Sequence, residues 1–154
     1  MAVANRAERR AAQRKWKVEE FREQAFEAKG TLAHIELEVG DEVFVIPNPL
    51  ALDDETQARV ESFQRGDELD RDTILDDDGT PLKSVTGDPI TRIKEPHQIG
   101  GVILEPVKTR SARAILGDDV HAKFIEAGGR STDVVTAWEW MVDQVKERSD
   151  DDPK

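Results

Sequence analysis

The chain has 154 residues, which fits one domain, and its charged (36%) and hydrophobic (37%) fractions leave a core that recruits only part of the sequence. The net charge of −11 opposes binding to nucleic acid and to anionic membranes, and the lack of cysteine excludes disulfide bonds. No apolar run resembles a signal peptide or approaches the ~20 residues of a membrane span, so we expect a cytoplasmic protein.

Residues 1–30 are predicted to form an N-terminal helix with a basic arm. Residues 5–29 lack proline and glycine, and Gly30 is suited to end the helix. Trp16 lies at the margin of its short apolar face. Residues 1–18 carry a net charge of +5, so the rest of the chain carries −16. The arm is the only element that suits nucleic acid, but a solvated or partner-binding helix is the preferred interpretation.

Residues 31–66 are predicted to form a β-hairpin followed by a short helix. Residues 35–46 alternate between apolar and polar around Gly40-Asp41, with Gly40 in the first central position of a type II′ turn. Leu37 then pairs with Phe44, and Ile35 with Ile46, on one apolar face.

The second face of this hairpin carries Val43 and Val45 beside two glutamates, which suggests that a helix or a partner covers it. Pro47 and Pro49 end the hairpin. Asp53 or Asp54 is then predicted to cap a helix that ends near Gly66.

Residues 67–108 are predicted to be an acidic, irregular and flexible excursion without an internal repeat. Turn signals dominate, for example Asp76-Asp77-Asp78-Gly79, and only Val102-Ile103-Leu104 is an apolar run. The excursion is expected to be mobile in the free protein.

Residues 109–147 are predicted to form a C-terminal helical hairpin, and residues 148–154 an acidic tail. A short helix is expected from Ser111 to Leu116. Asp118 or Asp119 caps the next helix, Gly128 ends it in a left-handed conformation, and Ser131 or Thr132 caps the last one. The overall prediction is a mainly α, α+β fold.

The last helix is predicted to bury a stripe of Val134, Trp138, Met141 and Val145. Trp140 falls on the opposite, polar face. Two interpretations stay open for Trp140: it packs under the excursion or against the N-terminal helix, or it contacts a partner protein, since tryptophan is enriched at such contacts.

No catalytic, metal or cofactor site is predicted. The acidic runs are hydrophilic, where solvent keeps carboxylates ordinary, and residues 76–79 do not align with a calcium loop. The histidines are too far apart for a zinc site, with His97 expected in a loop and His121 exposed on a helix. Residues 118–147 resemble a helix-turn-helix outline but carry a net charge of −4, which repels DNA.

Two strings are similar to the tail assembly chaperones of long-tailed phages that infect actinobacteria. They are Glu42-Val-Phe-Val-Ile-Pro-Asn-Pro49, with the acidic helix start after it, and residues 114–138. The resemblance covers under half of the chain. It implies a non-enzymatic factor of the host cytoplasm, absent from the mature virion, that binds the tape measure protein and helps to recruit tail tube protein.

The resemblance also implies two forms of the protein, the longer one made by programmed frameshift, with this chain as the shorter form. Asp152-Pro153-Lys154 permits codons that contain a slippery heptamer. The longer form is then a further partner, and homo-oligomer formation is compatible with the sequence. The candidate partner-binding residues are Trp140, Val43, Val45 and Trp16. The alternative function is a small nucleic-acid-binding regulator that uses the basic arm.

Overall fold

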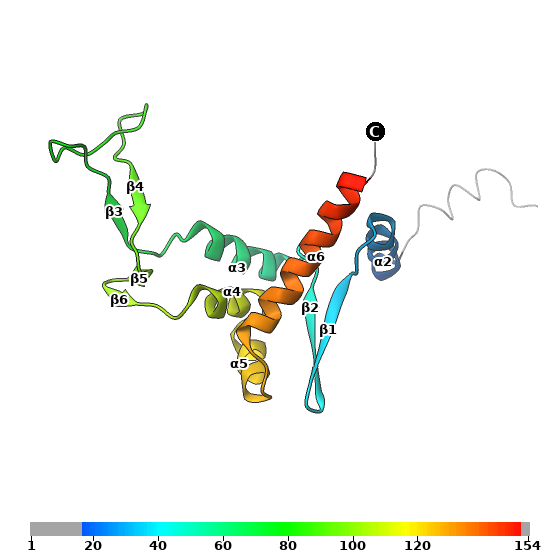
Figure 1. Cartoon of the computed structure of the whole chain (residues 1–154). Helices are drawn as coiled ribbons and strands as arrows, with labels where there is room; N and C mark the ends of the chain where they lie inside the picture. The colour runs from blue at the N-terminus through cyan, green and yellow to red at the C-terminus, as the bar shows by residue number, and fades with distance from the viewer. Residues whose placement is uncertain (1–16, 152–154) are drawn as a thin grey trace, which may run out of the picture.

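The protein has a mainly α, α+β fold, as the sequence predicts (Figure 1). The computed structural model describes residues 17–151, with side chains described for residues 17–147. The described residues form helices α2 to α6 and three antiparallel strand pairs. Residues 1–16 lie outside the described part of the chain, and they include Trp16 and most of the basic arm. Residues 152–154, the end of the acidic tail, also lie outside it.

Helix α2 (Val18–Lys29) ends where the sequence predicts. Gly30 follows it with φ 72°, a left-handed conformation that glycine adopts without steric cost. The N–H of Thr31 donates to the Phe26 carbonyl at 3.1 Å, and the N–H of Gly30 donates to Glu27 at 3.0 Å. These two bonds satisfy carbonyls of the last turn.

The β-hairpin is confirmed in its register. Strands β1 (His34–Val39) and β2 (Glu42–Pro47) pair antiparallel, with Leu37 opposite Phe44 and Ile35 opposite Ile46. Gly40 has φ 60° and no described non-glycine residue has positive φ, which fits the predicted type II′ turn.

Helix α3 (Asp54–Arg65) is also confirmed at both ends. The Asp53 carboxylate accepts the N–H of Thr56 at 2.7 Å, and this bond lowers the pKa of Asp53 below its usual value. Gly66 ends the helix with φ 64°. Asp53, not Asp54, is therefore the cap.

The excursion contains strands that the sequence analysis did not predict. Strand β3 (Arg71–Thr73) pairs with β4 (Thr91–Ile93), and β5 (Gln98–Ile99) pairs with β6 (Val102–Ile103). Asp70 joins the two ribbons, since its carboxylate accepts the N–H groups of Gly100 and Gly101 at 2.9 and 2.8 Å. These strands have only two or three residues, which is too short to show an alternation of apolar and polar residues. They are therefore recognised by their backbone hydrogen bonds and not by a sequence pattern.

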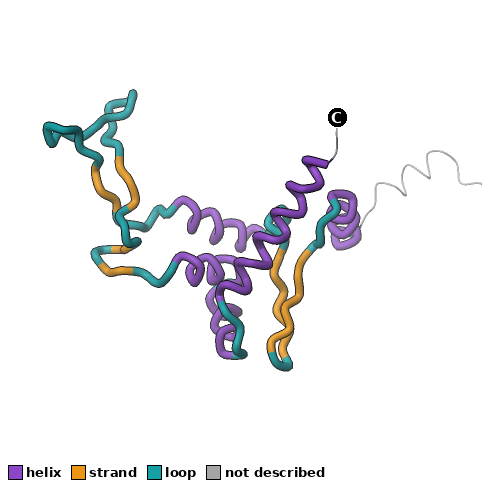
Figure 2. The backbone as a smooth tube through the Cα atoms, in the orientation of Figure 1, coloured by secondary structure: helices purple, strands orange, loops and turns teal. Residues whose placement is uncertain are grey.

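An eight-residue repetition organises the tip of the excursion, although the sequence analysis found no repeat. Three residues spaced by eight form a closed cycle of backbone hydrogen bonds, each 2.9 Å long. The N–H of Ile74 donates to the carbonyl of Ile90, that of Ile90 donates to Leu82, and that of Leu82 donates to Ile74. A Gly-x-Pro triplet follows Ile74 and another follows Leu82, at 79–81 and 87–89. The tip extends away from the helices (Figure 2). The predicted mobility of this segment stays a prediction.

Helix α4 (Val107–Leu116) begins four residues before the predicted start at Ser111. Pro106 precedes it, where its fixed φ suits a helix entry. Helix α5 (Asp118–Glu126) follows directly, with Gly117 in the cap position. The predicted aspartate cap is therefore wrong: both aspartates lie in the first turn, where their charge favours the helix dipole.

Gly128 ends α5 with φ 110°, as predicted. The N–H of Gly129 donates to Phe124 at 2.9 Å and that of Gly128 donates to Ile125 at 3.0 Å, which is the Schellman pattern. Helix α6 (Ser131–Asp151) then starts without the predicted hydroxyl cap. Instead, the N–H of Arg130 donates to the Asp133 carboxylate at 2.9 Å. Because α6 continues through Asp151, the tail is shorter than the predicted 148–154.

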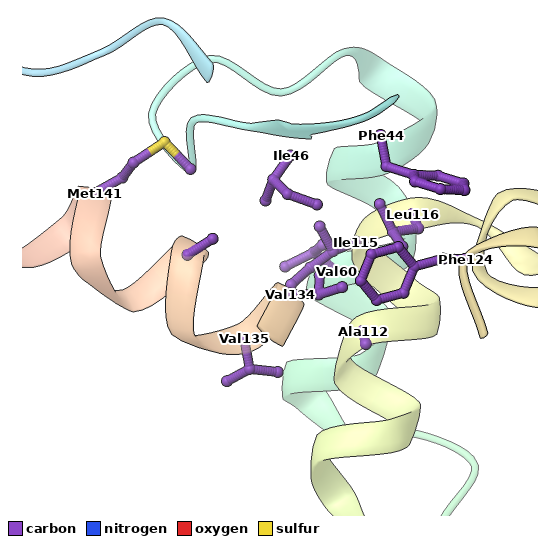
Figure 3. Close-up of a cluster of buried hydrophobic side chains, with 11 residues drawn as sticks. Phe44, Ile46, Val60, Ala112, Ile115, Leu116, Phe124, Val134, Val135 and Met141 are labelled. Atoms are coloured by element: carbon purple, nitrogen blue, oxygen red, sulfur yellow. The ribbon is translucent and has the colours of Figure 1, made fainter. Parts of the chain in front are cut away.

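The core lies where the inner face of the hairpin meets the helices. Phe44 and Ile46 of β2 point toward side chains of α3, α4, α5 and α6 (Figure 3). On α6 the buried residues are Val134, Val135, Ala137 and Met141. Trp138 is only partly buried, so the predicted stripe is correct in part and its centre lies at Ala137. The small side chains of Ala112 and Ala137 suit close packing between α4 and α6.

Candidate partner-binding surfaces

Trp140 lies in an apolar groove between the hairpin and helix α6. The groove has a volume of about 480 Å³ and is lined from β1 by Ile35, Leu37, Glu38 and Val39, from α5 by Phe124, and from α6 by Asp133, Thr136, Ala137 and Trp140. The Trp140 side chain is 45% exposed. Among the described residues, none of the excursion or of α2 lines this groove, and residues 1–16 of the predicted N-terminal helix lie outside the described part.

Two of the described residues that line the Trp140 groove are charged, and both are acidic, Glu38 and Asp133. The Asp133 carboxylate accepts the backbone N–H of Arg130. Because this donor is an uncharged backbone group, the bond does not neutralise the negative charge of Asp133. An apolar floor with an acidic rim suits a partner that presents apolar side chains flanked by basic ones.

Val43 and Val45 lie on the outer face of the hairpin, 56% and 51% exposed. Their cross-strand partners are Glu38 and Glu36, as the sequence predicts. No described helix covers this face. The predicted apolar surface therefore exists, and it is open among the described residues.

The structure does not bring the candidate residues together into one site. Trp140 faces the β1 side of the hairpin, whereas Val43 and Val45 line a different groove beside β2. Trp16 lies outside the described residues. The β1 wall of the Trp140 groove was not predicted, because Ile35 and Leu37 were assigned only to the inner apolar face of the hairpin.

A further hollow of about 730 Å³ lies between α3, α4 and the base of the excursion. Its arginines are already bonded within the chain. Arg110 stacks over the Phe63 ring at 5.7 Å and contacts His97 Nδ1 at 2.7 Å, while Arg113 contacts both carboxylate oxygens of Glu105 at 2.8 and 2.9 Å. We interpret these contacts as structural, because they hold the base of the excursion against α3 and α4.

His121 is buried, which corrects the expectation of an exposed helical histidine. It shares one face of α5 with Phe124, and its Nε2 lies 3.0 Å from the Ser131 hydroxyl. Burial lowers the pKa of His121, and repulsion from Arg113 lowers it further. The same Ser131 hydroxyl is thereby used for a contact between α5 and α6 rather than for the predicted cap.

The buried histidine predicts a loss of stability on acidification. Below the unfolded-state pKa of about 6.5, the unfolded chain binds a proton that the folded His121 resists. The free energy of unfolding should thus be constant above about pH 7 and fall as the pH decreases from about 6.5 toward the lowered folded pKa. Urea unfolding at several pH values between 5 and 7.5 measures this slope. His121→Gln should flatten it, and an unchanged slope in that variant would contradict the assignment.

Within the described part of the chain, no cluster of three or more histidine or acidic side chains has the arrangement of a metal site. Its helices are also too short or too polar to cross a membrane. The fold and the surfaces thus define an acidic, mainly α protein with open apolar grooves. Comparison of the chain with family profiles, curated proteins and solved structures finds no match.

Proposed function

We propose that the protein is a tail assembly chaperone of a long-tailed phage, which binds the tape measure protein and promotes assembly of the tail tube. The observation that carries the proposal is the half-exposed Trp140 in an acidic-rimmed apolar groove. A large aromatic side chain in such a place is typical of a contact with another protein. The resemblance of residues 42–49 and 114–138 to this family supports the same interpretation.

The proposed mechanism is reversible binding without chemistry. The chain masks apolar segments of an aggregation-prone partner in its grooves, and its net charge of −11 keeps the complex soluble. The proposal includes the host cytoplasm as location, absence from the finished virion, and a longer frameshifted form as a further partner. In that form, the shared domain would be linked to a second binding segment, which raises the effective concentration on the partner.

The test is co-purification with the tape measure protein of the same phage. Trp140→Ala should weaken capture of that protein at least tenfold, because truncation removes the central aromatic contact. Circular dichroism and the free energy of unfolding should change little, by about 1 kcal/mol or less, because Trp140 is not part of the core.

A matched control is Val85→Ala, which truncates an exposed apolar side chain at the tip of the excursion, outside both hairpin grooves. It should capture the tape measure protein as the unmodified chain does. Undiminished capture by Trp140→Ala would contradict the role of the groove. Salt-dependent retention on DNA, without capture of the tape measure protein, would favour the regulator that uses the basic arm.

A further inference from the structure

Among the described residues, the outer edge of strand β2 is unpaired along Val43 and Val45. In a hairpin with a two-residue loop, the pair beside the turn, Val39 and Glu42, exchanges both hydrogen bonds, and every second pair after it does the same. Val43 and Val45 belong to the intervening pairs. Their backbone N–H and C=O groups therefore point away from β1.

The hydrogen bonds of the described residues agree with this alternation. The N–H of Asn48 donates to Ala33 at 3.2 Å, which continues the bonded pairs beyond the end of the strands. No described residue provides a partner for the outward groups of Val43 and Val45. An unpaired strand edge of this kind is a template for a further strand.

A groove of about 390 Å³ lies against this edge. Its strand wall includes Val43, Phe44 and Val45, whose side chains alternate between the two faces, so the groove follows the backbone edge itself. Its opposite wall is apolar and is formed by Ile115, Leu116 and Val120. Figure 3 shows Leu116 beside Phe44 at this end of the core.

The charge around the groove is negative. Asp53 lines it directly, and the neighbouring hollow shares four lining residues with it. The described residues that line the two hollows together include five charged groups, with a net charge of −3: Asp53, Glu55, Asp118, Asp119 and Arg59. Arg59 is already bonded to Glu55 at 3.1 Å. Glu36 and Glu38 add negative charge on the outer face of the hairpin, opposite the two valines.

We propose that the β2 edge binds an extended segment of another protein in which apolar and basic residues alternate. The segment adds to β2 as a third strand. Its apolar side chains contact the wall that contains Val120, and its basic side chains meet the acidic rim. A second copy of this chain fits less well, because it brings the same acidic groups to the same rim. This surface is separate from the Trp140 groove, and the inference holds whether or not the tape measure protein is the partner.

The experiment uses a fluorescein-labelled, end-capped nonapeptide of alternating valine and lysine, titrated with the whole protein and followed by fluorescence anisotropy. Saturable binding is expected. The same peptide with glutamate in place of lysine should bind at least tenfold more weakly, because the rim is acidic. Absence of saturable binding by the lysine peptide, or equal binding of both peptides, would overturn the proposal.

Two pairs of variants locate the binding. Val45→Pro removes an outward N–H of β2, and Glu36→Pro removes the matching N–H on the outer edge of β1, at its cross-strand partner. Val120→Lys places a charge in the groove, whereas Ile125→Lys places one elsewhere on α5, at similar exposure (41% and 43%). Val45→Pro and Val120→Lys should weaken binding of the lysine peptide at least tenfold. Glu36→Pro and Ile125→Lys should bind it within twofold of the unmodified protein.

Equal losses within either pair would overturn the proposal. Thermal unfolding by circular dichroism verifies that each variant folds, and if Val45→Pro does not, the pair on α5 decides. Analytical ultracentrifugation of the free protein tests whether a second copy of this chain binds the β2 edge instead. A dimer that Val45→Pro dissociates, and that excludes the peptide, would assign the edge to a second copy of this chain and overturn the peptide proposal.

Discussion

Replacing Phe124 with alanine is expected to lower the free energy of unfolding by about 3 to 5 kcal/mol. Phe124 is fully buried and is among the largest such side chains. Its ring meets the Phe44 ring edge to face, with centroids 5.1 Å apart and planes at 87°, so the substitution removes an aromatic pair and leaves a cavity between the hairpin and the helices. Chemical denaturation of both proteins measures the difference.

Ile125→Ala is the matched control, because Ile125 is the next residue of α5 and is half exposed. It should cost about 1 kcal/mol or less. A domain of this kind has about 5 to 15 kcal/mol of stability, so the Phe124 variant should unfold at a clearly lower denaturant concentration. Similar losses in both variants would mean that α5 does not pack through Phe124.

The hairpin and helix α3 were predicted from the sequence in detail. Their signals are local: a glycine at a two-residue turn, alternation with period two, and a carboxylate three residues before the N–H that it caps. Gly40 and Asp53 hold these positions in the structure. Such features depend on a few neighbouring residues, and distant contacts do not need to be known.

The helical packing was predicted less well, because it depends on distant contacts. The predicted stripe rested on helical spacing and included Trp138, whereas the structure centres it on Ala137, a small side chain that suits close approach of α4. His121 was expected to be an exposed residue of its helix. Its Nε2 reaches the Ser131 hydroxyl across two helices, and the sequence gives no sign of that contact.

The exposure of the candidate residues was predicted from the sequence, but the shape of the grooves that they line was not. Trp140, Val43 and Val45 are exposed as expected, since a helical or strand period assigns each to an outer face. That Trp140 shares a groove with β1, while the valines line another beside β2, follows from how the hairpin sits against α5 and α6. The eight-residue repetition of the excursion was missed because it recurs in backbone hydrogen bonds and in only two Gly-x-Pro triplets.

Gly129→Ala is expected to lower the free energy of unfolding by about 1 to 3 kcal/mol. A Cβ atom at this position would lie 2.4 to 2.7 Å from three carbon atoms of the Phe124 ring, Cζ, Cε1 and Cε2. Phe124 is fully buried and its ring packs edge to face against Phe44, so the ring can move away from the new Cβ atom only by disturbing that contact. The loss of stability should come from overpacking, so it should depend on the presence of the Phe124 ring.

A double-mutant cycle with Phe124→Leu tests that dependence. Leucine lacks the three ring carbons that the new Cβ atom would approach, so Gly129→Ala should cost at least about 1 kcal/mol less in the Phe124→Leu background. Urea unfolding of the four proteins gives the coupling energy. Additive losses would show that the cost at position 129 arises from the backbone turn and not from overpacking against the Phe124 ring.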